Sequence, residues 1–595
     1  MLGYVYIKYS DIVGRRPHLN TLKKTLRQLK LSSTLFALTR INTLLGRQKI
    51  MDEGPSAMRD LQSLLVTNYI DDILRAEIET AIRRFRNAAS APSQFAVFTR
   101  QQILNLLRLA ILVCKEESSV LVDGQTVGAY QLGQSCVMMN DHLLTPREER
   151  AINEGGVTKR SKHIALQLAP IMELYNPLDL QRAVVRAETL FSDLLHSPEM
   201  LAIAKHQLHG LDISQAFFDA TGITLNRYRE IVLVMLTPIL GHSQEQLIGS
   251  QNLTLFQRAR MIRDTKLQPE EFESYLSLDC ISVREAKKRF ASKKGKILPH
   301  FNYVLFRTKP LLELDNGTIF WTDPCFLLEK LGAGIYWTIV DSLRGSQKDT
   351  ALTAFGYLFE IYINGILSRL SPKNGTLLAS PKYQNGDNAF DSMFFRADQL
   401  IVLEYKASFM KIEAKYSGKI KLFENELDKK FGVNKGVIQL AKHIQRLFPH
   451  DGSKRDAIPA LDLITQQSKR SIRKITPVLI VQEPILRFHG VEHLLDQRLR
   501  RLLKKQLVSR NIEIAPLAVF DVDTLEQMKP ALVAGDFTLE QCLRARAAKD
   551  PDYKQFWLDF LNLSFPGLLR RDPELEQKFS AILDRTRISV FGPGR

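Results

Sequence analysis

The feature that most constrains this chain is a short run of aliphatic residues that ends in two charged ones. Residues 400–403 read Leu-Ile-Val-Leu, and Glu404 and Lys406 follow two positions apart. Such a run predicts a buried strand, over residues 399–408. Side chains alternate along a strand, so Glu404 and Lys406 project from the same face. Burying both has a cost unless they pair with each other or bind something.

Regular elements are predicted on both sides of this strand, in the order helix, three strands, helix, strand. The helix that opens the series carries Glu360 on its apolar face, and the helix after the third strand carries Gln439 in its first turns. The six elements span residues 353–370, 376–384, 389–395, 399–408, 434–448 and 475–484. Alternation of strands and helices predicts an α/β domain here.

A second carboxylate is expected beside Glu404. Asp391 lies 13 residues before it, and a short turn at 396–398 separates the two strands. Antiparallel pairing across such a turn can bring the two side chains together. Two carboxylates supplemented by water and phosphate oxygens suit Mg²⁺. Lys406 beside the metal could orient or deprotonate an attacking water and offset charge that develops on a phosphate.

Other interpretations of these residues stay open. Glu404 and Lys406 could form a surface ion pair and nothing more, and a second Glu-x-Lys occurs at Glu413 and Lys415. Asp398 could replace Asp391 as a ligand, although an aspartate in a turn is favoured for local hydrogen bonding. His206 and His209 are three apart on a predicted helix and could share a metal, but exposed helical histidines are the preferred interpretation.

The order of elements, with Asp391, Glu404-Tyr405-Lys406, Glu360 and Gln439, resembles the PD-(D/E)xK nuclease superfamily. The resemblance implies a restriction-endonuclease-like fold in which Asp391 and Glu404 bind Mg²⁺ or Mn²⁺ and Lys406 assists the attacking water. It implies Glu360 as a further metal ligand and Gln439 as a site residue on the following helix. Phe390 stands where the motif has proline, and the charged segment 409–430 has no assigned role.

The charge of the chain fits a polyanionic partner. Lys and Arg total 82 against 64 Asp and Glu, which gives a net charge of +18. Two stretches concentrate basic residues that could follow a phosphate backbone. The first comprises Arg284, Lys287, Lys288, Arg289, Lys293, Lys294 and Lys296; the second comprises Arg498, Arg500, Arg501, Lys504, Lys505 and Arg510. The second is expected to form a helix whose leucines 499, 502 and 503 face the sheet.

The length of 595 residues predicts several domains. We expect an α+β multidomain protein: a mostly α-helical N-terminal half, then a restriction-endonuclease-like α/β core with a central mixed sheet. The expected divisions are a helical recognition or regulatory region at 1–295, a β-hairpin and connecting segment at 296–349, the nuclease-like domain at 350–525 and a helical extension at 526–595. Asp315-Asn316-Gly317 is the hairpin signal, because a tight primed turn needs positive φ.

Several classes of protein are disfavoured. The five cysteines are far apart and form no CxxC pair, which argues against a disulfide framework or a structural zinc site. We find no GxxxxGK[ST] loop, no signal peptide and no apolar run of bilayer length. The expected location is therefore cytoplasmic, with no membrane partner.

The sequence thus predicts a Mg²⁺-dependent endonuclease that acts on DNA, with duplex DNA as the expected partner. At the level of the family, bacterial defence against foreign DNA is the expected setting. A nucleic-acid-binding scaffold with an inactive nuclease domain and an RNA nuclease are the alternatives. A protein partner for the helical half and a homo-oligomer are compatible with all of these.

Overall fold

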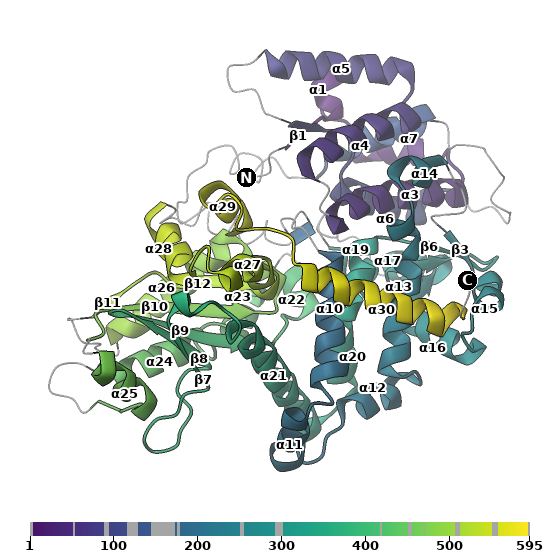
Figure 1. Ribbon diagram of the computed structural model, residues 1–595. Coiled ribbons are helices and arrows are strands. Elements are labelled where there is room, and N and C mark those ends of the chain that lie inside the picture. Colours follow the sequence, from purple (N-terminus) through teal and green to yellow (C-terminus); the bar gives the residue numbers. More distant parts are fainter. Residues whose placement is uncertain are drawn as a thin grey trace.

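The computed structural model shows a mixed α/β protein that is rich in helix and contains mixed β-sheets (Figure 1). The structure describes residues 4–51, 54–87, 94–115, 129–143, 173–174, 179–249, 255–291, 302–416, 419–449, 455–468, 471–505, 512–549 and 557–592. The expected combination of many helices with a mixed sheet is confirmed.

The N-terminal helices form a layer of their own, at the top of Figure 1. It contains α1 (Tyr9–Val13), α2 (Leu19–Leu26), α3 (Leu31–Ile50), α4 (Gly54–Tyr69), α5 (Asp72–Arg86), α6 (Arg100–Val113) and α7 (Ala129–Asn140). Two short parallel strands, β1 (Tyr4–Tyr6) and β2 (Gln94–Ala96), join its edge. Buried side chains such as Leu38, Leu104 and Val137 hold these helices together in one apolar core.

A second set of helices continues the helical part of the chain. It comprises α10 (Leu180–Glu188), the π-helix η1 (Thr189–Leu194), α11 (Pro198–Gln207), α12 (Ile213–Thr221), α13 (Leu225–Gly241), α14 (Gln244–Gly249), α15 (Arg258–Asp264), α16 (Pro269–Asp279), α17 (Val283–Ala291), α18 (Val304–Thr308), α19 (Pro324–Leu328), the 3-10 helix η3 (Glu329–Leu331) and α20 (Ala333–Ser342). Helix α13 is the most buried of the longer ones and lies against α16, α19 and α30.

A small sheet sits among these helices. Its strands are β3 (Leu255–Gln257), β4 (Cys280–Ser282), β5 (Leu311–Glu313) and β6 (Thr318–Trp321), in the order β3-β6-β5-β4. The predicted hairpin is confirmed, because β5 and β6 pair antiparallel and Gly317 has φ 76°. Strands β3 and β4 lie in a region expected to be helical. Strands of three residues are too short to show a period of two, so the sequence pattern could not reveal them.

The main sheet holds the predicted chemistry. Its strands are β7 (Thr376–Ala379), β8 (Ser392–Arg396), β9 (Gln399–Lys406), β10 (Lys474–Val481), β11 (Glu513–Ile514) and β12 (Ala518–Asp521). The order is β11-β10-β9-β8-β7, and β12 also pairs with β10. Strands β7, β8 and β9 are antiparallel, whereas β10 runs parallel to β9, β11 and β12. The sheet is therefore mixed.

Helices cover both faces of this sheet (Figure 1). They are α21 (Gly345–Leu367), α22 (Ile412–Tyr416), α23 (Ile420–Lys430), α24 (Val437–Leu447), α25 (Pro459–Ser468), α26 (His489–Lys505) and α27 (Val522–Ala534), with 3-10 turns at η4 (Pro372–Asn374) and η5 (Pro484–Arg487). Ile401 and Leu403 of β9 share a core with α21 and α27. Leu400 and Val402 share another with α24 and α26. This alternation follows from the period of two along a strand.

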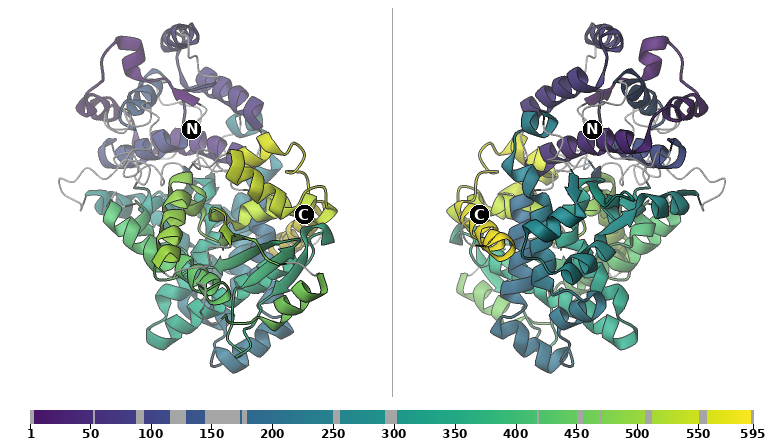
Figure 2. Two further views of the ribbon diagram at one scale, coloured as in Figure 1. Left: turned by 90° about the vertical axis from the view of Figure 1, so that its left-hand side faces the viewer. Right: turned by 90° about the vertical axis from the view of Figure 1, so that its right-hand side faces the viewer.

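The C-terminal helices tie the two parts of the chain together. They are α28 (Leu539–Lys549), α29 (Trp557–Ser564) and α30 (Pro573–Phe591). Helix α30 lies against α10 and α13, far from it in sequence, as the yellow helix in Figures 1 and 2 shows. One apolar core extends from Leu180 to Val590 and includes side chains of the main sheet. The sheet and the second set of helices are thus continuous through their shared core.

One described helix, α21, is long and apolar enough to cross a bilayer by length and composition. In this fold it packs on the main sheet and buries Ala354, Leu358 and Ile363 among other apolar residues. Its apolar character is therefore accounted for by the core of the protein.

Candidate active site at the end of strand β9

The pairing of β8 with β9 places Asp391 opposite Glu404. The ladder ends at Ser392 and Leu403, and the next residue on each strand is Asp391 and Glu404. The backbone N–H of Tyr405 donates a hydrogen bond of 2.5 Å to Oδ2 of Asp391. The predicted antiparallel pairing is confirmed, and it fixes the Asp391 carboxylate at the edge of the strand that carries Glu404.

Glu404 and Lys406 lie on the same face of β9, as the alternation of side chains requires. Lys406 Nζ donates to Glu404 Oε1 at 2.5 Å. The Glu404 side chain is only 2% exposed and that of Lys406 14% exposed. Because both are so well buried, this is not the solvated surface pair that the sequence left open.

The carboxylates of this cluster repel one another. Burial and the charge of Asp391 raise the pKa of Glu404 to about 8, although Lys406 opposes the shift. Burial also raises the pKa of Asp391, again against the opposing effect of Lys406. Burial alone would lower the pKa of Lys406, but Glu404, Asp391 and Glu360 outweigh burial and raise it. Lys406 is therefore a firmly protonated cation among crowded carboxyl groups.

Glu360 reaches the same cluster from α21. Its Oε1 accepts a hydrogen bond of 2.6 Å from Ser380, the residue after β7. Burial raises the pKa of Glu360, and the charge of Asp391 adds to this effect. The structure therefore brings Glu360 near Asp391 and Lys406, as the resemblance implied.

Two side chains that the sequence did not single out hold α21 in place. Asn364, one turn after Glu360, accepts hydrogen bonds at its Oδ1 from Ser392 at 2.6 Å and from Tyr405 at 3.1 Å. These bonds join α21 to β8 beside Asp391 and to β9 beside Glu404. Ser380 adopts φ 45°, which turns the chain sharply after β7. The sequence did contain a signal for Asn364, because it is a polar residue four positions after Glu360 on an apolar helix.

Gln439 lies in the first turn of α24, where the sequence placed it. Its Oε1 accepts the backbone N–H of Gly436 at 3.0 Å and so caps the helix. Within the described residues, no hydrogen bond joins Gln439 to the carboxylates or to Lys406. Its observed role is local: it stabilises the start of α24.

The other candidate residues lie elsewhere. Asp398 is in the turn between β8 and β9, at the opposite end of β9 from Glu404, so it cannot replace Asp391. His206 and His209 are both exposed, as expected. Lys415 is buried and pairs with Glu173 at 3.3 Å and with Glu483 at 3.0 Å, so the second Glu-x-Lys has a structural role.

The first basic stretch is only partly described. Arg284, Lys287, Lys288 and Arg289 lie on α17, and Arg284 and Arg289 form ion pairs with Asp315 and Glu285. Lys293, Lys294 and Lys296 lie outside the described residues. The partners of Arg284 and Arg289 reduce the charge that this helix presents to a polyanion.

The second basic stretch lies on α26, whose Leu499 and Leu503 are buried against the sheet as expected. Arg501 and Lys504 are exposed, whereas nothing is described of the Lys505 side chain, and Arg510 lies outside the described residues. Arg498 is buried, and its Nη2 pairs with Asp428 of α23 at 2.8 Å. Arg498 therefore stabilises the packing of α26 on α23, and we do not include it in a nucleic-acid surface.

The two carboxylates of Asp391 and Glu404 are suitable ligands for a hard divalent cation such as Mg²⁺. Among the described residues, no group of three or more His, Cys, Asp and Glu is arranged to hold a metal ion. Mg²⁺ needs only one or two protein carboxylates, with water and substrate oxygens completing its shell. Asp391 and Glu404 supply that number. Burial raises the pKa values of both, and the charge of Asp391 adds to the shift of Glu404, so a bound cation would stabilise their charged forms.

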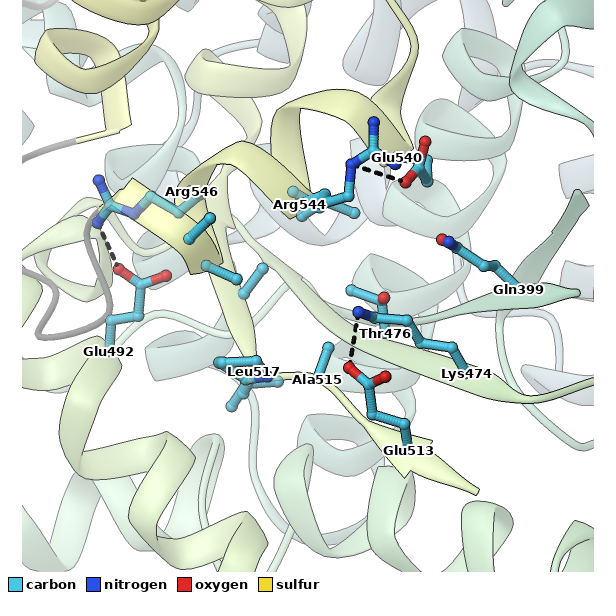
Figure 3. Close-up of a pocket in the computed structure, with 15 residues that line it drawn as sticks. Gln399, Lys474, Thr476, Glu492, Glu513, Ala515, Leu517, Glu540, Arg544 and Arg546 are labelled. Carbon is cyan, nitrogen blue, oxygen red and sulfur yellow. Dashed lines mark hydrogen bonds and ion pairs between the residues drawn. The ribbon is translucent and has the colours of Figure 1, made fainter. Parts of the chain in front are cut away.

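A separate cavity of about 330 Å³ lies at the other end of the main sheet (Figure 3). It is lined by Gln399 and Lys474, the first residues of β9 and β10, and by side chains of α26 and α28. Three ion pairs surround it: Glu492 with Arg546, Glu513 with Lys474 and Glu540 with Arg544. Each carboxylate there has its own cation, so the wall of the cavity is electrically balanced.

Comparison of the chain with protein-family models, with curated proteins and with solved structures finds no match in any of the three. The function must therefore be inferred from the residues and their geometry.

Proposed function

We propose that this protein is a metal-dependent endonuclease that hydrolyses phosphodiester bonds in DNA. The observation that carries the proposal is the convergence of Asp391, Glu404 and Lys406 at the end of β9, fixed by the register of β8 on β9. The proposed fold is the restriction-endonuclease-like one. The order of α21, β7, β8, β9, α24 and β10, with β9 and β10 parallel, supports it.

Each residue of the site has a distinct proposed role. Asp391 and Glu404 would hold Mg²⁺ or Mn²⁺. Glu360 is the further ligand that the resemblance implies, although no three such groups are arranged around one metal position among the described residues. Such a cation polarises a phosphoryl oxygen and lowers the pKa of water. Lys406 is protonated in this environment, so its role is to orient the attacking water and to stabilise negative charge on the phosphate rather than to accept a proton.

The test is cleavage of plasmid DNA in the presence of Mg²⁺ or Mn²⁺. We expect Asp391→Asn and Lys406→Ala to lose activity by about 10²-fold or more, since each removes a charged group at the reacting phosphate. The matched control for Asp391→Asn is Asp398→Asn at the far end of the same hairpin, which should cleave like the wild type.

Equal activity in the wild type, Asp391→Asn and Lys406→Ala would contradict the proposal. Salt-sensitive DNA binding by the wild type without cleavage would indicate the inactive scaffold instead. Parallel digests of duplex DNA, single-stranded DNA and RNA identify the substrate, and preference for RNA would replace the DNA assignment.

A further inference from the structure

Four lysines from three segments gather near the exit of β9. Lys411 lies five residues after Lys406, Lys429 and Lys430 end α23, and Lys435 precedes α24. Lys411, Lys429 and Lys435 are exposed, and Lys430 is half-buried. We call these four residues the lysine cluster. None of them belongs to the two basic stretches that the sequence pointed to.

The turn between α23 and α24 is folded tightly, and this brings the ends of the two helices together. Gly436 has φ 60°, and a Cβ atom there would lie 2.7 Å from the carbonyl oxygen of Phe431. The N–H of Val437 donates to the same oxygen at 3.0 Å. Only glycine fits this conformation and this approach. Lys430, at the end of α23, therefore lies close enough to Lys435 to feel its charge across the turn.

The segment after β9 is attached to the same place. The backbone N–H of Lys411 donates to Oε1 of Glu426 on α23 at 3.3 Å. Glu426 lies one turn before Lys430 on that helix, so Lys411 is held beside the lysines at its end. Three separate parts of the chain thus carry positive charge to one surface.

The charges of the lysine cluster are not balanced by ion pairs. Within the described residues none of the four lysines pairs with a carboxylate. Burial lowers the pKa of Lys430, and the charges of Lys435, Lys429 and Lys411 lower it further against the opposing effect of Glu426. Lys430 is thus repelled by three neighbouring cations, and this surplus of positive charge suits an anion with several charges.

The lysine cluster is within reach of a substrate bound at the active site. Lys411 is five positions after Lys406, so their Cα atoms are at most roughly 18 Å apart. Duplex DNA rises about 3.4 Å per base pair, so this distance corresponds to about five base pairs. A duplex of this length therefore spans the distance between the two places.

We propose that the lysine cluster binds the phosphate backbone of duplex DNA beside the bond that is cleaved. The proposal rests on the proposed nuclease function for its substrate, but it concerns binding rather than cleavage. It assigns the main nucleic-acid surface to the turn between α23 and α24 and to the exit of β9, and not to α17 or α26.

The test is fluorescence anisotropy of a labelled 30-base-pair duplex in EDTA, where a metal-dependent enzyme cannot cleave. The variant replaces Lys411, Lys429, Lys430 and Lys435 by Gln. We expect its dissociation constant to rise by about 10-fold or more at 0.1 M salt, and the slope of log K against log salt to fall by about one for each lysine that contacts a phosphate. A triple variant that keeps the half-buried Lys430 should show most of the effect.

The matched control removes four charges from the predicted basic stretches, as Lys287→Gln, Lys288→Gln, Arg501→Gln and Lys504→Gln. It should bind close to wild type. Wild-type affinity in the lysine-cluster variants, or equal loss in the control, would overturn the proposal. Cleavage by the wild type separates the two ideas: if the wild type does not cleave but the lysine-cluster variants still bind weakly, the nuclease function fails and the binding surface stands.

Discussion

At one end of β9 three carboxylates surround a single lysine, whereas at the other end each carboxylate around the cavity has a cation of its own. Burial raises the pKa values of Asp391, Glu404 and Glu360. The charge of Asp391 raises those of the two glutamates further, and Lys406 offsets the shifts only in part. In the cavity of Figure 3, Glu492 is fully buried, yet it pairs with Arg546 at 3.1 Å and accepts hydrogen bonds from Val519 and Trp557.

The difference separates charges that are paired within the fold from charges that the fold offsets only in part. A buried group with its own partner is satisfied within the protein, and removing that partner is costly. A cluster of like charges is relieved by protonation or by a bound cation. Glu404 and Glu492 are both buried, at 2% and 0% exposed, so burial alone does not distinguish the two ends of the sheet; the pairing of their charges does.

The largest effect is expected where a balanced pair is broken. Glu492→Gln leaves Arg546 buried without its counter-charge, which should lower the free energy of unfolding by about 3 kcal/mol or more. The measurement is denaturant or thermal unfolding at pH 7. Lys474→Gln is the control, because its pair with the 66% exposed Glu513 should contribute under about 1 kcal/mol. Similar losses in both variants would contradict the comparison.

The unbalanced end should respond to a divalent cation. Mn²⁺ or Mg²⁺ at ten times its dissociation constant should stabilise the wild type by about 1.4 kcal/mol, through binding to the folded state alone. This corresponds to a rise of a few degrees in the thermal midpoint. Asp391→Asn and Glu404→Gln should lose the rise, and Lys474→Gln at the balanced end should keep it. If the cation raised the thermal midpoint of Asp391→Asn as much as that of the wild type, Asp391 would not be a metal ligand.

The smallest effect is a pH dependence near the unbalanced end. Burial and the charges of Arg446, Lys406 and Lys442 lower the pKa of His443 to about 4, and its ring also contacts Tyr383 and Phe390. Between this value and the ordinary value of about 6.5, the unfolded state binds more protons than the folded state. Stability contributed by neutral His443 is therefore complete above about pH 6.5 and is lost as the pH falls towards 4.

His443→Phe keeps an aromatic ring and cannot titrate. Relative to wild type, its thermal midpoint should fall less between pH 6.5 and pH 4.5. Thermal unfolding at several pH values measures this difference, and Tyr357, which is remote from His443, offers a Tyr357→Phe control. Parallel pH profiles for the wild type and His443→Phe would show that His443 does not contribute.

Local pattern was enough to predict the strands of the site. Leu400 to Leu403 form a buried strand because aliphatic residues need a core on both sides, and the turn after Arg396 pairs this strand with the one before it. The alternation of side chains then puts Glu404 and Lys406 on one face. The pairing also carries Asp391 to the right place, since it depends on residues close together in sequence.

What could not be predicted depends on contacts between distant segments. Asn364 is recognisable as important only when its partners Ser392 and Tyr405 are known. The sequence placed Arg498 among the basic residues that could follow a phosphate backbone. In the fold its guanidinium pairs with Asp428 of α23. The lysine cluster was invisible for the same reason, because Lys411, Lys430 and Lys435 lie on different elements.

The sequence by itself determined the strands of the candidate site and which side chains share a face of β9, because hydrophobic period and turn chemistry act over a few residues. Only the tertiary structure decided which charges are paired. Coulombic interactions depend on distance in space and on burial, and both arise when segments far apart in the chain meet. The net charge of +18 was plain from composition, whereas the grouping of Lys411, Lys429, Lys430 and Lys435 follows from the fold.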